Sequence, residues 1–423
     1  MKEEQLGIRR TLALEAARLL NKSLRREHPL RQVFWESTVR CNIYCRHCGS
    51  DCRKDPPLPS LKGRESSPFK GNCPLKAEQL GSISDGGQKL ERVFDMPRED
   101  FFRVLDGIAK KQNPGEVFII LGGGEPLVRE DVVECAKGIS ERGFPWGMVT
   151  NGLYLTPEMF RDLRRAGLCS ITVSLDGLEE QHTWLRRHPD CFRMASQAID
   201  MIVRDGTLVY DVMTVVHQHN YDTLPQLRDY LIEKGVTDWR LATIFPVGRG
   251  AQDKDLQLTG EQLKGLLDFI RQTRREGKIH ASYGCEGFLG PYEGDVRDWM
   301  FRCSAGVTVA SVLVDGSISA CTSIRSNYKQ GNIYEDDFMD VWEHRFQPHR
   351  NHDWMKTGDC KDCRYWRYCE GNGLHLRDDE GRLLLCHMKR MEPHPQARLD
   401  DQRESQPFPG ERGETNGKRL NGK

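Results

Sequence analysis

The sequence predicts an α/β fold, in which a partial (β/α)6 TIM-like barrel precedes a smaller cysteine-rich domain. Short β-rich segments alternate with helical patterns through the first 277 residues, which is typical of a parallel sheet with right-handed crossovers. Six such units suit an incomplete barrel better than a closed eightfold one. From residue 278 the pattern changes to a hairpin-turn signal at Asp315-Gly316 and closely spaced cysteines.

The N-terminal two thirds contain a helical extension and the barrel. Residues 1–30 form the extension, because Leu12, Ala16 and Leu19 recur at helical spacing, and we expect its arginines to form a solvated face. The barrel spans 31–277, with a helix at 259–276 and strands at 33–38, 117–121, 146–150, 170–175, 209–216 and 238–245.

Three further segments complete the organisation. Residues 53–91, rich in Pro, Gly, Ser and Lys, interrupt the first βα unit as either a lid or a disordered connection. Residues 278–390 form the cysteine-rich domain, with a hairpin over 307–321. Residues 391–423 carry almost no apolar side chains, and we expect a disordered tail.

Composition limits the partners. The chain has 62 Lys and Arg against 62 Asp and Glu, so no overall field favours nucleic acid or anionic membranes. No segment approaches the ~20 apolar residues that span a bilayer, and the N-terminus lacks a signal-peptide apolar region. We therefore expect a cytoplasmic protein without a nucleic-acid or membrane partner.

The 15 cysteines are the unusual feature of the composition. Without an export signal, cytosolic thiol buffers keep cysteines reduced, which favours metal binding over a disulfide framework. Most of them cluster near residues 41–52 and again from 285 to 386. The scattered ones lack ligand spacing and are expected to be small buried hydrophobes, namely Cys73, Cys135, Cys169 and Cys191.

The segment Cys41-Asn-Ile-Tyr-Cys45-Arg-His-Cys48 places three thiols at the end of the first expected strand. A cubane iron–sulfur cluster usually takes four cysteines, so three leave one iron open. A zinc site is the alternative, although zinc sites favour paired CxxC units and a fourth ligand. The spacing resembles the CxxxCxxC loop of the radical S-adenosylmethionine (SAM) superfamily. That resemblance implies that the amino and carboxylate groups of SAM bind the open iron.

The next strand ends carry further matches to this superfamily. The run from Leu121 to Pro126 resembles its GGE motif, which implies that Gly123, Gly124 and Glu125 bind the SAM amino group. In such enzymes the reduced cluster cleaves SAM to methionine and a 5′-deoxyadenosyl radical, which abstracts hydrogen from the substrate.

The fourth strand end and the following helix supply the remaining SAM contacts. Ser174 and Asp176 correspond to residues that lie near the SAM ribose in relatives. Arg186 matches an arginine that pairs with the SAM carboxylate, a role that suits a permanently charged fork. Its neighbour Arg187 is the alternative for that match.

The C-terminal cysteines form a second pattern, which resembles the SPASM domain of peptide-modifying radical SAM enzymes. Cys303 is followed by Gly316 and Cys321, at the spacing that this domain uses. The resemblance implies two auxiliary iron–sulfur clusters, Aux I nearer the active site and Aux II near the surface. It assigns a complete Aux II set to Cys360, Cys363, Cys369 and Cys386. It assigns Aux I to Cys303 and Cys321, with Cys285 as the nearby upstream thiol.

The sequence departs from the SPASM pattern at one position. The family has a further cysteine four residues after Cys369, where this chain has Gly373. Aux I then has at most three thiolates. It either binds substrate, carries a ligand other than cysteine, or is a smaller cluster. Two zinc sites are the remaining alternative, since soft thiolate sites accept both metals.

Together the two resemblances cover residues 31–387 and imply a radical SAM oxidoreductase that modifies a peptide or protein side chain, with a reductant such as flavodoxin or ferredoxin. The product could be a thioether or carbon–carbon crosslink, an epimer, or a formylglycine as in sulfatase-maturing relatives. The run GCEGFLG at 284–290 suggests the branch encoded beside predicted lipoproteins.

The alternative class is a non-catalytic iron–sulfur or zinc protein that binds a partner or transfers electrons. We expect the substrate to add a strand beside 307–319; no catalytic acid or base is assigned.

Overall fold

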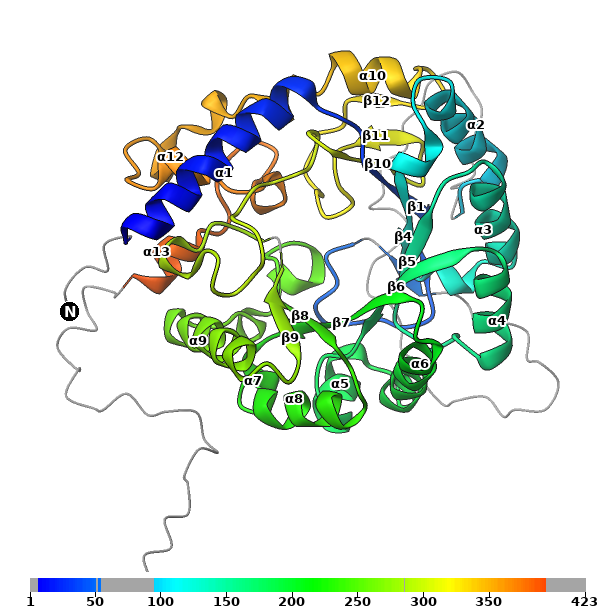
Figure 1. Ribbon diagram of the computed structural model, residues 1–423, viewed down its shortest axis with the longest axis horizontal. Coiled ribbons are helices and arrows are strands. Elements are labelled where there is room, and N and C mark those ends of the chain that lie inside the picture. The colour runs from blue at the N-terminus through cyan, green and yellow to red at the C-terminus, as the bar shows by residue number, and fades with distance from the viewer. Residues whose placement is uncertain (1–6, 51, 55–94, 285, 393–423) are drawn as a thin grey trace, which may run out of the picture.

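A computed structural model describes residues 7–50, 52–54, 95–284 and 286–392. Its main sheet has ten strands in the order β12-β11-β10-β1-β4-β5-β6-β7-β8-β9. The strands from β1 to β9 in this order are parallel and curve into the open barrel of Figure 1, with helices on the outside. The predicted α/β partial barrel is therefore confirmed.

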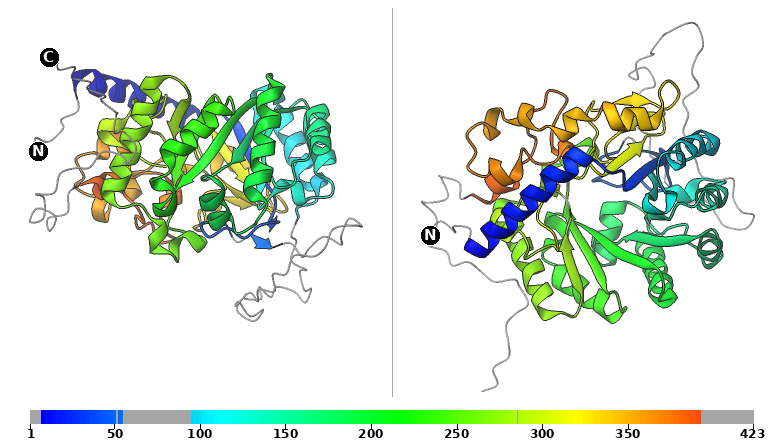
Figure 2. Two further views of the ribbon diagram at one scale, coloured as in Figure 1. Left: turned by 90° about the horizontal axis from the view of Figure 1, so that it is seen from below. Right: turned by 45° about the horizontal axis from the view of Figure 1, so that its top comes forward.

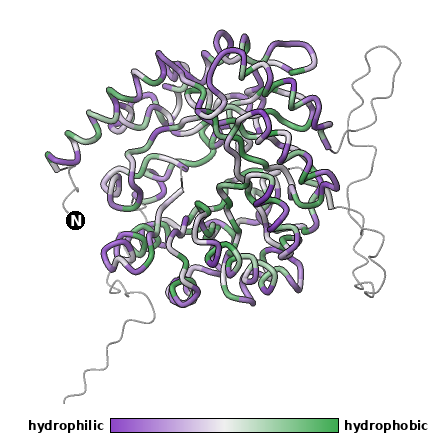
Figure 3. The backbone as a smooth tube through the Cα atoms, turned by 45° about the vertical axis from the view of Figure 1, so that its right-hand side comes forward, coloured by the Kyte–Doolittle hydropathy of each residue, from purple (hydrophilic) through white to green (hydrophobic). Residues whose placement is uncertain are grey.

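The barrel strands lie where the β-rich segments predict them. Their bounds are β1 Gln32–Thr38, β4 Phe118–Gly123, β5 Trp146–Thr150, β6 Leu168–Ser174, β7 Val209–Val216, β8 Asp238–Thr243 and β9 His280–Tyr283. Strand β9, which the sequence did not predict, extends the parallel sheet beside β8. In Figure 3 the backbone of the strands is coloured largely as hydrophobic, whereas that of the outer helices alternates between hydrophobic and hydrophilic residues.

The outer helices have the amphipathic patterns expected of a barrel's outer layer. They are α2 Arg98–Ala109, α3 Val132–Glu141, α4 Pro157–Arg165, α5 Glu179–Arg186, α6 Cys191–Asp205, α7 Gln218–Tyr221, α8 Leu224–Glu233 and α9 Gly260–Glu276. The core between helices and sheet is aromatic. Trp35 of β1 is fully buried and stacks on Phe101 of α2, with 4.4 Å between ring centroids.

The C-terminal domain continues the barrel sheet. Strands β10 (Val309–Val312) and β11 (Ser317–Ser319) form the predicted hairpin, and β12 is Gly331–Asn332. Because β10 pairs with β1 and β11 pairs with β12, neither hairpin strand has a free edge. The expectation that a substrate adds a strand beside 307–319 is therefore wrong.

The helices of the C-terminal domain are short. They are α10 Phe338–His344, α11 Gln347–Arg350, α12 Trp366–Cys369 and α13 His387–Met391. The bridging strands β2 (Arg40–Cys41) and β3 (Arg53–Lys54) pair at the start of the insertion. The rest of that insertion, Cys73, Cys285 and the tail from 393 lie outside the described residues.

Helix α1 (Ile8–Glu27) packs against the C-terminal domain, as the two views of Figure 2 show. Two of its arginines face that domain: Arg10 pairs with Asp295 at 2.7 Å and Arg25 pairs with Glu370 at 2.6 Å. Leu12, by contrast, is 65% exposed. The expected solvated basic face is wrong for these two arginines. The helix is held on the domain by their ion pairs and by Leu14, which is buried against Phe288 and Phe301.

Across the described residues, no helix is both long enough and apolar enough to span a membrane.

Candidate active site

The three-cysteine loop lies at the carboxyl end of β1. Cys41 and Cys45 are buried in a small apolar cluster with Ile43 and Leu153, and Cys48 packs against that cluster. Burial raises the pKa of Cys41 to about 12 and that of Cys45 to about 11. The three thiols predicted as cluster ligands are thus brought together in one shielded loop.

A fourth thiol, Cys52, lies in the same loop. It is buried in the cluster with Cys41 and Cys45. A hydrogen bond from the Cys52 thiol lowers the pKa of Cys48 to about 6. Cys52 belongs to the N-terminal cysteine group of the sequence but had no predicted role, although its spacing from Cys48 repeats that between Cys41 and Cys45.

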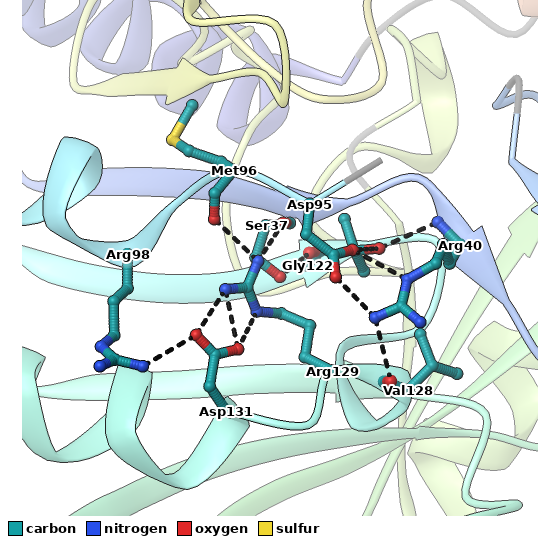
Figure 4. A network of polar contacts seen from close by, with 10 residues as sticks. Ser37, Arg40, Asp95, Met96, Arg98, Gly122, Val128, Arg129 and Asp131 are labelled. Carbon is teal, nitrogen blue, oxygen red and sulfur yellow. Dashed lines mark hydrogen bonds and ion pairs between the residues drawn. The ribbon is translucent and has the colours of Figure 1, made fainter. Parts of the chain in front are cut away.

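A polar network fixes the backbone that leads into the loop (Figure 4). Arg40, the residue before Cys41, binds both carboxylate oxygens of Asp95, with Nε–Oδ1 at 3.0 Å and Nη2–Oδ2 at 2.5 Å. The buried Arg129 donates from Nη1 to the carbonyl oxygens of Ser37 (2.7 Å) and Met96 (2.9 Å). Charge-assisted hydrogen bonds of this kind are stronger than neutral ones. The loop therefore starts from a rigid base.

The glycines of the GGE motif bring β4 against this same backbone. A Cβ atom at Gly123 would lie 2.1 Å from the carbonyl oxygen of Thr38, and one at Gly124 would lie 2.0 Å from that of Arg40. The Gly124 and Glu125 amides donate to these carbonyl oxygens at 2.8 and 2.9 Å. Glycine is thus required here because the backbone of β4 lies directly against the backbone that leads into the cysteine loop. The predicted contact of these glycines with SAM stays a prediction.

Glu125 follows the glycines and is fully enclosed. Its Oε1 accepts a hydrogen bond from Thr150 Oγ1 at 2.8 Å, and its Oε2 accepts one from the Asn151 amide at 2.7 Å. Burial raises the pKa of Glu125 to about 7, although these hydrogen bonds oppose the increase. Asn151 in turn donates to Asn42 Oδ1 at 2.8 Å, inside the cysteine loop. Glu125 is therefore linked to the loop through the end of β5.

Asp176 and Arg186 form a buried ion pair beside the loop. Arg186 Nε donates to Asp176 Oδ2 at 2.5 Å, and Arg186 Nη1 lies 3.9 Å from Cys45 Sγ. Burial alone would raise the pKa of Asp176, but Arg186 holds it well below its usual range. Ser174 is buried at the end of β6. Both candidate arginines reach the loop. Arg186 is buried beside Cys45, whereas Arg187 is exposed at the helix C-terminus and lies over the Tyr44 ring, 5.9 Å from its centroid.

The C-terminal cysteines gather in two places. Cys369 and Cys386 pack together around Phe288 and Phe301. Burial raises the pKa of Cys386, and the neighbouring Cys363 and Cys360 thiols add to the increase. The set predicted for Aux II is thus brought together by the fold.

The described cysteines predicted for Aux I, Cys303 and Cys321, both pack against the main hydrophobic core, and Cys303 also contacts the cluster around Phe288 and Phe301. Burial raises the pKa of Cys321, and the nearby Cys303 adds to this increase. Among the described residues, no three His, Cys, Asp or Glu side chains converge on a point that could hold a single metal ion. A cubane binds each cysteine through a separate iron atom, so its ligands surround a cluster rather than one ion.

Comparison with known families matches residues 35–231 to the radical SAM superfamily and residues 303–364 to the SPASM iron–sulfur cluster-binding domain. Together these segments make up more than half of the chain. The chain belongs to the radical SAM superfamily and carries a SPASM domain.

Relatives of this radical SAM/SPASM enzyme include two differently named groups. It is 25% identical over 359 residues to the AdoMet-dependent heme synthase of Methanosarcina barkeri, which covers 81% of this chain and 90% of that protein. It is 27% identical over 347 residues to the mycofactocin maturase MftC of Mycolicibacterium smegmatis, which covers 80% of this chain and 76% of that protein.

Solved structures share the fold of the radical SAM/SPASM enzyme. Streptococcus suis SuiB bound to precursor peptide SuiA matches with a TM-score of 0.58 at 16% identity, over 84% of this chain and 74% of that one. Native anSMEcpe with bound AdoMet and Cp18Cys peptide matches with a TM-score of 0.59 at 17% identity, over 86% of this chain and 95% of that one.

The family determines the cofactors of the radical SAM/SPASM enzyme. It uses a 4Fe–4S cluster with SAM, and its SPASM domain binds auxiliary iron–sulfur clusters. Because the chain is an enzyme of this family, the non-catalytic alternative is dropped. The residues that hold each cofactor stay a prediction, and the buried thiols and the Asp176–Arg186 pair fit that prediction chemically.

Proposed function

We propose that this radical SAM/SPASM enzyme modifies a side chain of a peptide or protein. The observation that carries the proposal is the SPASM domain joined to a radical SAM domain, the combination that resembles peptide-modifying enzymes. The named activity of MftC, a maturase, supports it, as does the precursor peptide in the SuiB structure. A reductant such as flavodoxin or ferredoxin completes the reaction.

The proposed site divides the work among residues that the fold already holds in place. Cys41, Cys45 and Cys48 hold the cluster that, with SAM, supplies a 5′-deoxyadenosyl radical. Arg186, fixed by Asp176, presents its guanidinium beside Cys45 and can hold the carboxylate of SAM there. Burial of these groups excludes water, and the protein's contribution to such chemistry is placement and shielding.

A second candidate function is a reaction on an iron porphyrin. It is favoured by one observation: several relatives that match about four fifths of the chain are named AdoMet-dependent heme synthase. The two candidates share the SAM-dependent step and differ only in the molecule from which hydrogen is taken. They are therefore separable by supplying each substrate class to the same preparation.

The test is an anaerobic assay of the reconstituted enzyme with SAM and dithionite or reduced flavodoxin. One arm contains short peptides and lipoprotein segments encoded next to the gene, and the other contains iron porphyrins. We expect peptide-dependent 5′-deoxyadenosine formation together with a modified peptide in mass spectra. Modification of the porphyrin with no change in any peptide would contradict the proposal.

The same spectra distinguish the possible products. A thioether or carbon–carbon crosslink removes two hydrogens from the peptide, whereas an epimer leaves the mass unchanged in H2O and gains one deuterium in D2O. Formylglycine formation requires a cysteine or serine in the peptide, so replacing that residue by alanine abolishes the product. The matched control is the enzyme with Cys41, Cys45 and Cys48 replaced by alanine.

A further inference from the structure

The position at which this chain lacks the expected auxiliary cysteine lies beside one of the thiols predicted for Aux I, Cys303. A Cβ atom built at Gly373 would lie 3.6 Å from Cys303 Sγ. The same Cβ would lie 2.6 Å from Cε1 and 2.7 Å from Nδ1 of His375. Real side chains do not approach this closely, so the imidazole of His375 fills the space that a side chain at position 373 would occupy.

The imidazole of His375 is buried, and one of its two ring nitrogens has no hydrogen-bond partner among the described residues. It is only 7% exposed and its ring packs against Phe245, with 4.6 Å between the centroids. Nε2 has no hydrogen-bond partner among the described residues, whereas a backbone hydrogen bond ties the ring to Glu286. An imidazole that donates from one ring nitrogen carries a lone pair on the other.

An unpartnered nitrogen in such a place calls for an explanation, because buried polar atoms are almost always hydrogen-bonded. The pattern is that of a metal-ligating histidine, in which one ring nitrogen donates to a backbone carbonyl and the other binds metal. Cys303 lies beside this space and Cys321 is a neighbour of Cys303, and the SPASM domain to which both belong binds iron–sulfur clusters.

We propose that Nε2 of His375 is the non-cysteine ligand of the Aux I cluster, together with the thiolates of Cys303 and Cys321. Imidazole replaces cysteine on iron in known iron–sulfur proteins, where it raises the reduction potential. The proposal rests on the auxiliary clusters of the SPASM domain and is independent of whether the substrate is a peptide. Gly373 left three possibilities for Aux I: a bound substrate, a ligand other than cysteine, or a smaller cluster. The proposal selects the ligand other than cysteine.

The contact between positions 373 and 375 gives the proposal a specific consequence. A cysteine cannot enter at 373 while the imidazole remains, because its Cβ would overlap the ring. Gly373→Cys alone should therefore lower iron content. Gly373→Cys combined with His375→Ala should restore it, because the double variant recreates the all-cysteine arrangement of the family.

The experiment measures the histidine nitrogen directly. Cys41, Cys45 and Cys48 are replaced by alanine so that only SPASM clusters give electron paramagnetic resonance signals, and the full chain is prepared with natural or ¹⁵N-labelled histidine. We expect a nitrogen hyperfine coupling to the reduced Aux I cluster that changes with the label. Absence of any label-dependent coupling in this protein overturns the proposal, and this measurement needs no variant at His375.

Variants then identify the histidine. His375→Cys should keep the iron, lose the coupling and lower the midpoint potential of the cluster. His352→Ala is the matched control, because His352 is also buried in the SPASM domain but both of its ring nitrogens have partners. Nε2 lies 2.9 Å from the carbonyl oxygen of His349, and Nδ1 lies 3.0 Å from that of Glu370 and 3.4 Å from Arg25 Nη2. A coupling that survives in His375→Cys, or one that disappears in His352→Ala alone, overturns the proposal.

Discussion

The barrel and the SPASM domain of this enzyme hold their cysteines in different ways. Barrel strands reach eight residues in β7, α9 has 17, and side chains such as Trp146 and Trp239 are almost fully buried between sheet and helices. Around Aux II the regular elements are single turns, such as the four residues of α12. The parallel sheet and its helices therefore support the cysteine loop of the barrel, whereas little regular secondary structure supports the Aux II cysteines.

Buried arginines partly compensate for the missing regular structure in the SPASM domain. Arg377 is 1% exposed and donates to the carbonyl oxygens of Gly371 (2.9 Å) and Gly381 (2.5 Å) and to Cys360 Sγ (3.3 Å). Such contacts fix loop carbonyls but bury little apolar surface. We therefore expect metal binding to supply part of the folding free energy of the SPASM domain, and the barrel to fold without its cluster.

The largest expected effect tests the barrel side of this comparison. Replacing Cys41, Cys45 and Cys48 together by alanine should abolish reductive SAM cleavage, because no residue then holds the cluster. The iron of the SPASM domain and the thermal unfolding of the barrel should be retained. Anaerobic product chromatography measures SAM cleavage, iron analysis measures the SPASM iron, and thermal denaturation measures the stability of the barrel. Unchanged 5′-deoxyadenosine formation would show that Cys41, Cys45 and Cys48 do not hold the SAM-binding cluster.

The second prediction concerns the SPASM side. Replacing Cys360, Cys363, Cys369 and Cys386 by serine should remove Aux II and expose the surrounding backbone amides. We expect hydrogen exchange over 358–392 to rise by at least tenfold, which corresponds to about 1.4 kcal/mol of lost local stability. Protection of β4 to β8 should be unchanged. Equal loss in both regions would mean that the two domains unfold as one unit.

A third prediction separates binding from stability at the Asp176–Arg186 pair. Asp176→Ala leaves the Arg186 guanidinium buried without its partner, which should destabilise the barrel by about 3–5 kcal/mol. It should also weaken SAM binding without removing iron. Urea unfolding and equilibrium binding measure the two effects. The control is Asp190→Ala, whose partner Arg193 is half exposed and should change stability by less than about 0.5 kcal/mol.

The sequence predicted the barrel well because hydrophobic periodicity and strand ends are local properties. The predicted ranges 146–150 and 209–216 coincide with β5 and β7. The buried Asp176–Arg186 pair and the role of the GGE glycines as contacts for the cysteine loop depend on which strand ends meet. No local pattern contains that information.

The SPASM domain was predictable as a cysteine pattern but not in its ligand geometry. The position of the His375 ring was not predicted, because the family has its cysteine at 373 and here a single turn of 3-10 helix at Leu374–Leu376 brings the side chain of residue 375 into that space. Nothing in the spacing of the cysteines predicts such a turn. The predicted orientation of α1 was wrong for a related reason: the partners of its arginines, Asp295 and Glu370, are distant in sequence.

The last prediction, with the smallest expected effect, tests whether the ion pairs of α1 or the bound metal stabilise the SPASM domain. Arg10 and Arg25 of α1 reach Asp295 and Glu370, but all four side chains remain in contact with solvent. Such ion pairs contribute about 0.2–1 kcal/mol each and weaken with salt. Arg10→Ala and Arg25→Ala should therefore each reduce stability by no more than this, and leave hydrogen exchange around Aux II unchanged. A loss of protection over 358–392 as large as that caused by removing the Aux II cysteines would show that α1 is the main support of the domain, and that its metal is not.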